Sequence, residues 1–277
     1  MSYNNFIPTV WAKNIERDLE RKLVFAEDCN RKYEGTVKKM GDTIRILGVG
    51  KPTITTTVDK DITLPDAETV EDTSVSLAIR HIAYFNYMVG DIDAAQAAGN
   101  IMAALNEESA QGTANEMDKF IANMALEEEA VLHAKAAESV TVENALNLLD
   151  KAAEMLYVND VPADSEIVAT VPPWYYMIYK RAYMQRDTNN SAMMKNGRAG
   201  QYGNITIKMS NNVAKSGNDS RIMVRTKKAI AFANPMTHVE PYRPEKKFAD
   251  AVKGFVLFDG KIVRPKELIV LNVKPGV

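Results

Sequence analysis

Residues 47–72 read LGVGKPTITTTVDKDITLPDAETVED, and this stretch decides how the rest of the chain is interpreted. The run at 54–58 is rich in β-branched residues, which favour strands. Pro52 and Pro65 punctuate the stretch, and it holds little apolar mass from which to build a core. We therefore expect a long two-stranded ribbon that reaches out from the body. Because a lone ribbon is only marginally stable in water, another surface has to support it.

The flanking segments complete this picture. Residues 43–46 follow a Gly-Asp turn and predict a strand that leads into the ribbon, and the alternation of residues 75–79 predicts the strand that returns. Further upstream, four large apolar residues recur every fourth position, which predicts an amphipathic helix. They are Trp11, Ile15, Leu19 and Leu23. This helix needs a surface to lie on, either in its own domain or in a neighbouring subunit.

The remainder of the chain mixes helices and strands. Residues 91–135 are rich in Ala, Glu, Met and Leu and predict the longest helix, with Gly112 as a point of weakness. A second helix runs from a Thr141 cap to about Asn159, and a third follows the two prolines at 172–173. Strands are expected at 167–171, 205–209, 222–224, 229–232, 237–240, 255–258 and 268–271. Strands and helices do not alternate regularly, so the fold class is α+β.

Composition narrows the function. The 277 residues are 46% hydrophobic and 25% charged, which is typical of a globular protein with a sizeable core. The net charge of −2 argues against a dedicated nucleic-acid binder. Residues 41–220 carry a net charge of −11 and residues 221–277 a net charge of +7. This difference is either an uneven distribution of charge on a solvated surface or the basis of an attraction within or between subunits. The sequence contains no run of about 18 apolar residues, so it predicts no membrane span.

No motif in the sequence predicts catalysis. His81, His133 and His238 are isolated from each other, and each is better explained as a structural histidine. Cys29 has no histidine or basic cluster beside it to activate the thiol, and a single cysteine fits a reducing cytosol. We expect no catalytic, cofactor-binding or metal-binding residues, and a structural subunit rather than an enzyme. A soluble enzyme whose site is assembled from distant residues stays open as the alternative.

The order of several segments resembles that of a known family. The chain is similar to the major capsid proteins of tailed bacteriophages, which have the Hong Kong-type capsid fold. The segments that carry the resemblance are 6–11, 41–46, 84–87 running into 91–96, 161–162 before 168–172, 243–248 and 260–268. Each segment alone is weakly specific, and their order over nearly the whole chain makes the case.

The resemblance implies a layout. Residues 1–34 would form an N-terminal arm and 35–82 the extended loop with its flanking strands. Residues 83–140 and 236–277 would form the peripheral domain with its long spine helix, and 141–235 the axial domain.

It also implies a function, a setting and partners. Copies of the chain would build pentamers and hexamers of an icosahedral shell around double-stranded DNA, which is enclosed without sequence-specific binding. The shell would assemble in the cytoplasm of a bacterial host and become the virion, with no membrane and no cofactor. A portal and a separate scaffolding protein are further partners that the resemblance suggests. An encapsulin-like shell that stores enzymes is the near alternative.

Contacts between subunits can be predicted from charge. We expect the acidic ribbon of one subunit to lie against basic residues of a neighbour, while Trp11 of the terminal helix provides an apolar contact. The acidic residues are Asp59, Asp61, Asp66, Glu68, Glu71 and Asp72, and the basic candidates are Arg225, Lys227, Lys228, Arg243, Lys246 and Lys247.

Overall fold

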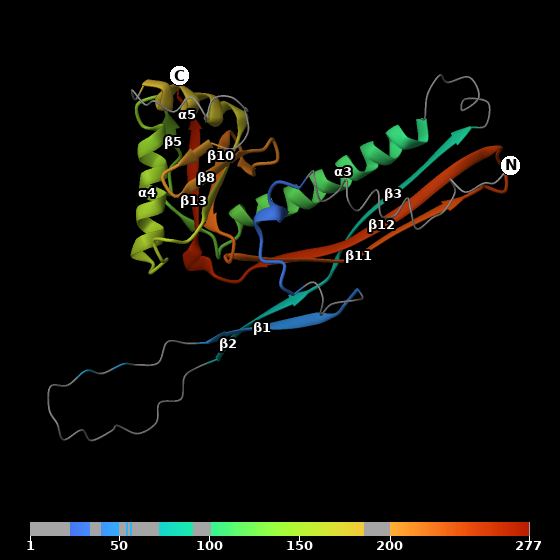
Figure 1. The fold of residues 1–277 in the computed structure, drawn as a ribbon, viewed down its shortest axis with the longest axis horizontal. Helices are drawn as coiled ribbons and strands as arrows, with labels where there is room; N and C mark the ends of the chain where they lie inside the picture. The colour runs from blue at the N-terminus through green and yellow to red at the C-terminus, as the bar shows by residue number, and fades with distance from the viewer. Residues whose placement is uncertain are drawn as a thin grey trace.

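The computed structural model describes residues 23–33, 40–49, 54, 56, 72–90, 101–185 and 200–276. Figure 1 shows three parts: a mixed sheet with two helices, a long narrow sheet beside a long helix, and a two-stranded ribbon that lies below the long sheet in this view. The expected N-terminal helix and most of the ribbon's outer part lie outside the described residues.

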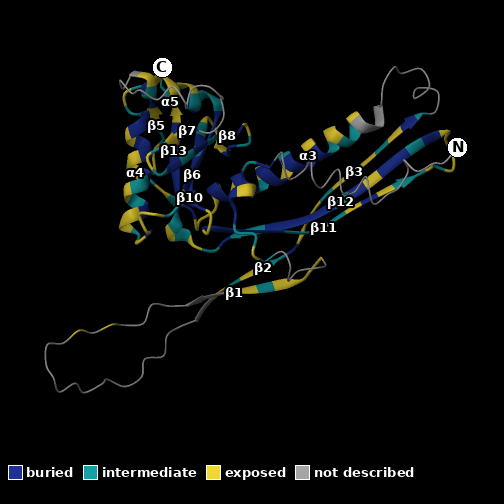
Figure 2. Ribbon diagram, in the orientation of Figure 1, coloured by how far each residue is buried: buried dark blue, intermediate teal, exposed yellow. Residues whose placement is uncertain are grey.

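The first part is an eight-stranded mixed sheet with the order β4-β13-β10-β6-β8-β7, to which β5 and β9 add at β13 and β10. Its strands are β4 (Val131–Leu132), β5 (Glu138–Val140), β6 (Ile167–Val171), β7 (Gly200–Tyr202), β8 (Ile205–Met209), β9 (Lys215–Ser216), β10 (Asp219–Thr226) and β13 (Leu268–Pro275). Every residue of β6 is buried, as the apolar run predicts. The helices α4 (Ala145–Val158) and α5 (Pro173–Gln185) contact each other, and α4 packs on the central strands. Figure 2 shows those strands as the buried centre.

The second part is a three-stranded antiparallel sheet with the order β11-β12-β3. It comprises β3 (His81–Gly90), β11 (Ile230–Tyr242) and β12 (Ala249–Ile262), with α3 (Ile101–Asn123) lying along one face (Figure 1). Phe85 and Tyr87 of β3 pack toward Ala110 of α3, so the alternate residues of β3 occupy the opposite face. Short 3-10 turns lie at Ala26–Asp28, Met124–Leu126 and Pro265–Glu267.

The third part is the base of the expected ribbon. β1 (Thr43–Val49) pairs antiparallel with β2 (Asp72–Ala78) in continuous register from Thr43–Ala78 to Val49–Asp72. At its inner end, Ile46, Leu77 and Ile79 join a small apolar cluster with Leu257 of β12. The ribbon is therefore anchored to the three-stranded sheet at one end, and both predicted flanking strands are present.

The helix predicted over 91–135 ends earlier than expected. α3 stops at Asn123, and His133 donates its backbone N–H to the carbonyl of Val270 at 3.0 Å, next to the pairing of β4 with β13. Tertiary pairing therefore overrides helix propensity beyond residue 126. Gly112 does not break α3. At α4 the residue before the helix is Asn144, whose side chain accepts a hydrogen bond from the Thr141 N–H, so the expected Thr141 cap is wrong.

Residues 236–277, which were expected to belong to the peripheral domain, contribute strands to two sheets. β12 stays in the three-stranded sheet up to Ile262, but β13 pairs with β10 over six residue pairs and belongs to the eight-stranded sheet. β11 begins at Ile230, ahead of the expected boundary at 235, because it continues along β12 through an irregularity between Ala233 and Met236.

Candidate assembly surfaces

Residues 24–28 are clasped between two parts of the molecule. On one side, the buried carboxylate of Asp118 in α3 accepts hydrogen bonds from three consecutive backbone N–H groups, those of residues 24–26, at 2.8–3.2 Å. On the other side, the guanidinium of Arg225 in β10 donates to the carbonyl oxygens of Phe25, at 2.9 Å, and Asp28. This clasp joins the long helix to the eight-stranded sheet through a segment distant from both in sequence.

The clasp overturns one predicted contact. Arg225 was expected to meet the acidic ribbon of a neighbour, but it is only 1% exposed and its guanidinium is used inside its own subunit. A buried charged group is tolerated only when its N–H groups have hydrogen-bond acceptors, and here the carbonyl oxygens of Phe25 and Asp28 are acceptors. Arg225 is therefore a structural residue, and its role could not be read from local sequence.

Burial also sets the electrostatics of the clasp. Burial raises the pKa of Asp118 above its ordinary value, and the three N–H groups and nearby Arg225 offset this only in part. Burial likewise raises the pKa of the Cys29 thiol, which makes it a poor nucleophile. Lys208 contacts Asp28 at 2.7 Å and Glu27 at 2.8 Å. Burial alone would lower its pKa, but these carboxylates outweigh burial and raise it.

The remaining basic candidates fall into two groups. Lys227 and Lys228 lie in the turn between β10 and β11, where Lys227 forms an ion pair with Glu166 at 2.7 Å. Arg243, Lys246 and Lys247 lie in the turn that joins β11 to β12. The two groups sit at opposite ends of β11, a strand of 13 residues that spans roughly 40 Å at the usual rise. They do not form the single basic surface that the sequence suggested.

The β11–β12 turn has a further feature that the sequence search missed. Phe248 is 88% exposed and directly follows two exposed lysines, Lys246 and Lys247. A large apolar side chain surrounded by cationic ones has the composition of an interface anchor with a polar rim. Below, the hairpin tip means residues 243–248.

A second apolar surface lies on the face of the three-stranded sheet that α3 does not cover. Ile82, Tyr84 and Met88 alternate along β3 and are exposed, with Tyr84 at 84%. Across the strand pair, Tyr84 is directly opposite Phe255. Exposed apolar residues gathered on one sheet face are typical of protein–protein contacts.

The histidines and acidic clusters have structural roles where they are described. His81 lies 3.0 Å from Asp259, and the buried His133 accepts the backbone N–H of Asn272 at 3.1 Å. Over the part of the chain that the structure describes, no group of three or more His, Cys, Asp or Glu side chains could hold a metal ion. The same part contains no helix long and apolar enough to cross a membrane.

Six predicted contact residues lie outside the described residues, so the structure does not place them. They are Trp11, Asp59, Asp61, Asp66, Glu68 and Glu71. Of the predicted basic residues, the structure thus places Arg243, Lys246 and Lys247 in one turn and Lys227 and Lys228 in another.

An anchored ribbon base, a long helix beside a narrow sheet, and a separate mixed sheet are the features by which this fold can be compared with solved structures. The chain has the Hong Kong-type fold of phage major capsid proteins, as comparison with solved structures shows.

A chain from Mycobacterium phage Che8 superimposes with a TM-score of 0.73 at 26% identity over 90% of both chains. The capsid of cyanophage P-SCSP1u gives a TM-score of 0.67 at 15% identity, covering 91% of this chain and 88% of that one. A virus-like particle from Pyrococcus furiosus gives 0.59 at 9% identity, covering 93% and 95%. No protein-family model and no curated protein matches the chain.

Proposed function

We propose that this chain is the major capsid protein of a tailed phage or prophage and that its copies assemble into the icosahedral shell around double-stranded DNA. The observation that carries the proposal is the agreement with the Che8 chain over 90% of both chains. The described base of the ribbon, β1 paired with β2, supports the same proposal, because a shell subunit can use a projection to reach its neighbours.

The proposed mechanism is geometric. Each subunit offers several separate contact surfaces, including the hairpin tip and the uncovered face of the three-stranded sheet. Each contact contributes modestly, and closure into rings and then a shell converts them into a stable assembly. Pentamers and hexamers, a portal and a separate scaffolding protein follow from the family resemblance and complete the proposal.

Electron microscopy of the purified protein tests this directly. We expect closed particles of megadalton mass, and a monomer or small oligomer at high concentration would contradict the proposal. A shell that stores an enzyme as cargo is the competing function. Nuclease treatment of particles from infected or induced cells separates the two, because a phage shell protects DNA and a cargo shell retains an enzyme.

Within this function, the acidic ribbon is proposed to lie against the hairpin tip of a neighbouring subunit. Exposed ion pairs contribute only about 0–1 kcal/mol each, so they would set register while apolar contacts at Phe248 supply affinity. The charge reversals Asp59→Lys, Asp61→Lys and Asp66→Lys are expected to slow assembly, measured by light scattering, and to reduce its salt dependence. Combining them with Lys246→Glu and Lys247→Glu should restore part of the rate. Unchanged assembly and salt dependence in the triple variant would refute this pairing.

A further inference from the structure

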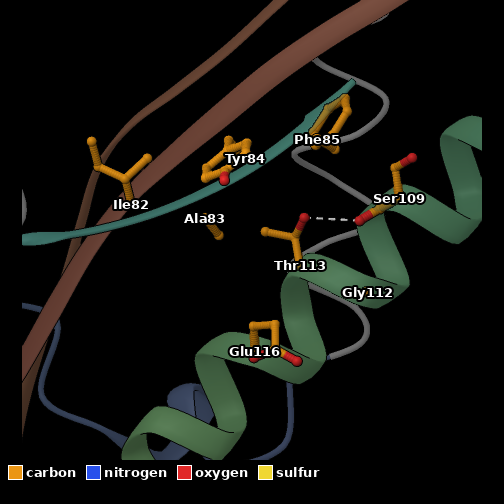
Figure 3. A pocket seen from close by; sticks show the side chains of 8 residues that line it. All are labelled: Ile82, Ala83, Tyr84, Phe85, Ser109, Gly112, Thr113 and Glu116. Carbon is orange, nitrogen blue, oxygen red and sulfur yellow. Dashed lines mark hydrogen bonds between the residues drawn. The ribbon is translucent and has the colours of Figure 1, made fainter. Parts of the chain in front are cut away.

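The outer faces of α4 and α5 form a surface that none of the contacts above uses. The groove of about 410 Å3 between β3 and α3 (Figure 3) is not separate in this way, because Ile82 and Tyr84 on its strand side belong to the apolar surface already described. The two helices lie instead with the eight-stranded sheet, at the other end of the molecule from the hairpin tip, and they contact each other (Figure 1). A contact made there would not compete with the hairpin tip.

The outer face of α5 is apolar and basic. Met177 and Met184 are 54% and 50% exposed and lie two turns apart, and Lys180 and Arg181 are exposed between them. α5 contains no acidic residue, and the ion pairs found among the described residues include neither cation. Methionine side chains adapt to the shape of a partner. This face therefore fits a partner surface that is both apolar and acidic.

The outer face of α4 has that composition. Asp150, Glu154 and Val158 recur every fourth residue, so they lie on one side of the helix, and all three are exposed, Val158 at 76%. The only cation of α4 is Lys151, and its ammonium group lies 3.6 Å from the carboxylate of Glu138, which offsets its charge. The chain thus presents an acidic and apolar helix face beside a basic and apolar one.

The two faces match in spacing as well as in charge. Glu154 precedes Val158 by four residues, and Lys180 precedes Met184 by four, so the charge and the apolar side chain are about 6 Å apart along each helix axis. When Glu154 of one copy lies against Lys180 of another, Val158 can therefore lie against Met184. Complementary charges that pair in this way fix the register of a contact.

We infer that the outer face of α4 in one copy docks against the outer face of α5 in the next, with the pairs Glu154–Lys180 and Val158–Met184. The two faces are different surfaces of one subunit, so the contact is heterologous and repeats head to tail around a ring. Each copy uses α4 toward one neighbour and α5 toward the other. The inference rests on the proposed shell function, since it names a contact that joins copies within one ring.

Site-directed crosslinking tests this contact. In a Cys29→Ala background, Val158→Cys is combined with Met184→Cys, and the assembled particles are treated with a short bis-maleimide. We expect a ladder of crosslinked species on a denaturing gel that extends beyond the dimer, because each copy is joined to two neighbours. The controls are the two single variants, Val158→Cys and Met184→Cys. Their yield should be at least several-fold lower, because a heterologous contact does not bring two copies of one position together.

The other crosslinking outcomes contradict the inference. Equal yields from a single variant would show a symmetric contact, and a crosslink confined to one chain would show that the two positions are neighbours within a subunit. Well-formed particles without the ladder would overturn the inference and leave the shell function standing. Failure of the original protein to form particles would instead contradict the proposed function.

Charge reversal provides a second test that does not need cysteine variants to assemble. Glu154→Lys and Lys180→Glu alone are each expected to slow assembly at least several-fold, measured by light scattering, and the combination of both should recover most of the rate. Glu108→Lys, a change of an exposed acid on α3, controls for the altered net charge and should have little effect. A combination no faster than the single variants would overturn the pairing of Glu154 with Lys180.

Discussion

Asp118 shows how one buried residue fixes the relation between distant parts of the chain. Its carboxylate satisfies three backbone N–H groups that would otherwise be buried without acceptors, at a cost of about 1–3 kcal/mol each. Arg225 satisfies carbonyl oxygens of the same segment from the opposite side. Neither role could be predicted from sequence, because a lone acid on a helix and a lone arginine in a strand form no local motif. Pooling the basic residues of 221–277 by charge therefore misassigned Arg225 to the surface.

Asp118 also makes a prediction about pH. Its folded-state pKa is raised above the ordinary 3.8, mainly by burial, so the folded protein holds the proton more tightly than the unfolded chain. The stability contributed by Asp118 is then fully present below 3.8 and falls as pH rises through the raised pKa. Asp118→Asn removes this titration. We expect the unfolding free energy of the original protein, relative to that of the variant, to be greater at about pH 4 than at pH 7.

Urea denaturation of unassembled subunits at several pH values measures this difference. Gln111→Ala, an exposed change on the same helix, controls for the general pH dependence of the protein. A difference between the Asp118→Asn variant and the original protein that stays constant from pH 4 to pH 7 would show that the folded-state pKa is not raised.

At the scale of elements, sequence patterns predicted which helices and strands exist better than they predicted where each one begins and ends. The strand at 167–171 and the ribbon's flanking strands were identified because apolar periodicity is local. The sequence predicted two short strands in place of β11, because Asn234 and Pro235 interrupt the apolar pattern. In the structure the strand runs through both residues with a shift in its register against β12. The helix over 91–135 was overextended because the pairing of β4 with β13 depends on residues about 140 positions away. Long-range pairing leaves no trace in a local window.

Two glycines provide a matched test of packing in the long sheet and helix. A Cβ at Gly254 of β12 would lie 2.5 Å from the Phe85 ring and 2.9 Å from the His238 carbonyl oxygen, so Gly254→Ala should destabilise the subunit by about 1–3 kcal/mol. Gly112→Ala meets open space within α3 and should stabilise it by up to about 1 kcal/mol. Thermal unfolding of both variants measures the contrast, and equal midpoints would contradict the packing of β12 against β3.

At the scale of the whole molecule, the described surfaces lie far apart along the long axis of Figure 1. The eight-stranded sheet is at one end and the hairpin tip is at the other. β11 and β12 join these two ends. Along the buried middle of the sheet, these two strands carry no run of exposed charged residues. A subunit with this shape can contact different neighbours at each end. Closure of a shell requires such separation, because each copy must meet several others without competition for one surface.

The hairpin tip gives the most direct test of that arrangement. Phe248 contributes nothing to the buried core, so Phe248→Ser should leave the thermal unfolding of the subunit within about 0.5 kcal/mol of the original. If it anchors a contact between copies, its loss should cost more than about 1–2 kcal/mol per contact, and repetition of the loss around a closed shell should abolish or strongly delay particles. Phe248→Leu keeps an apolar side chain and should restore assembly in large part. Light scattering and electron microscopy follow both variants, and normal particles from Phe248→Ser would place the end-to-end contacts elsewhere on the subunit.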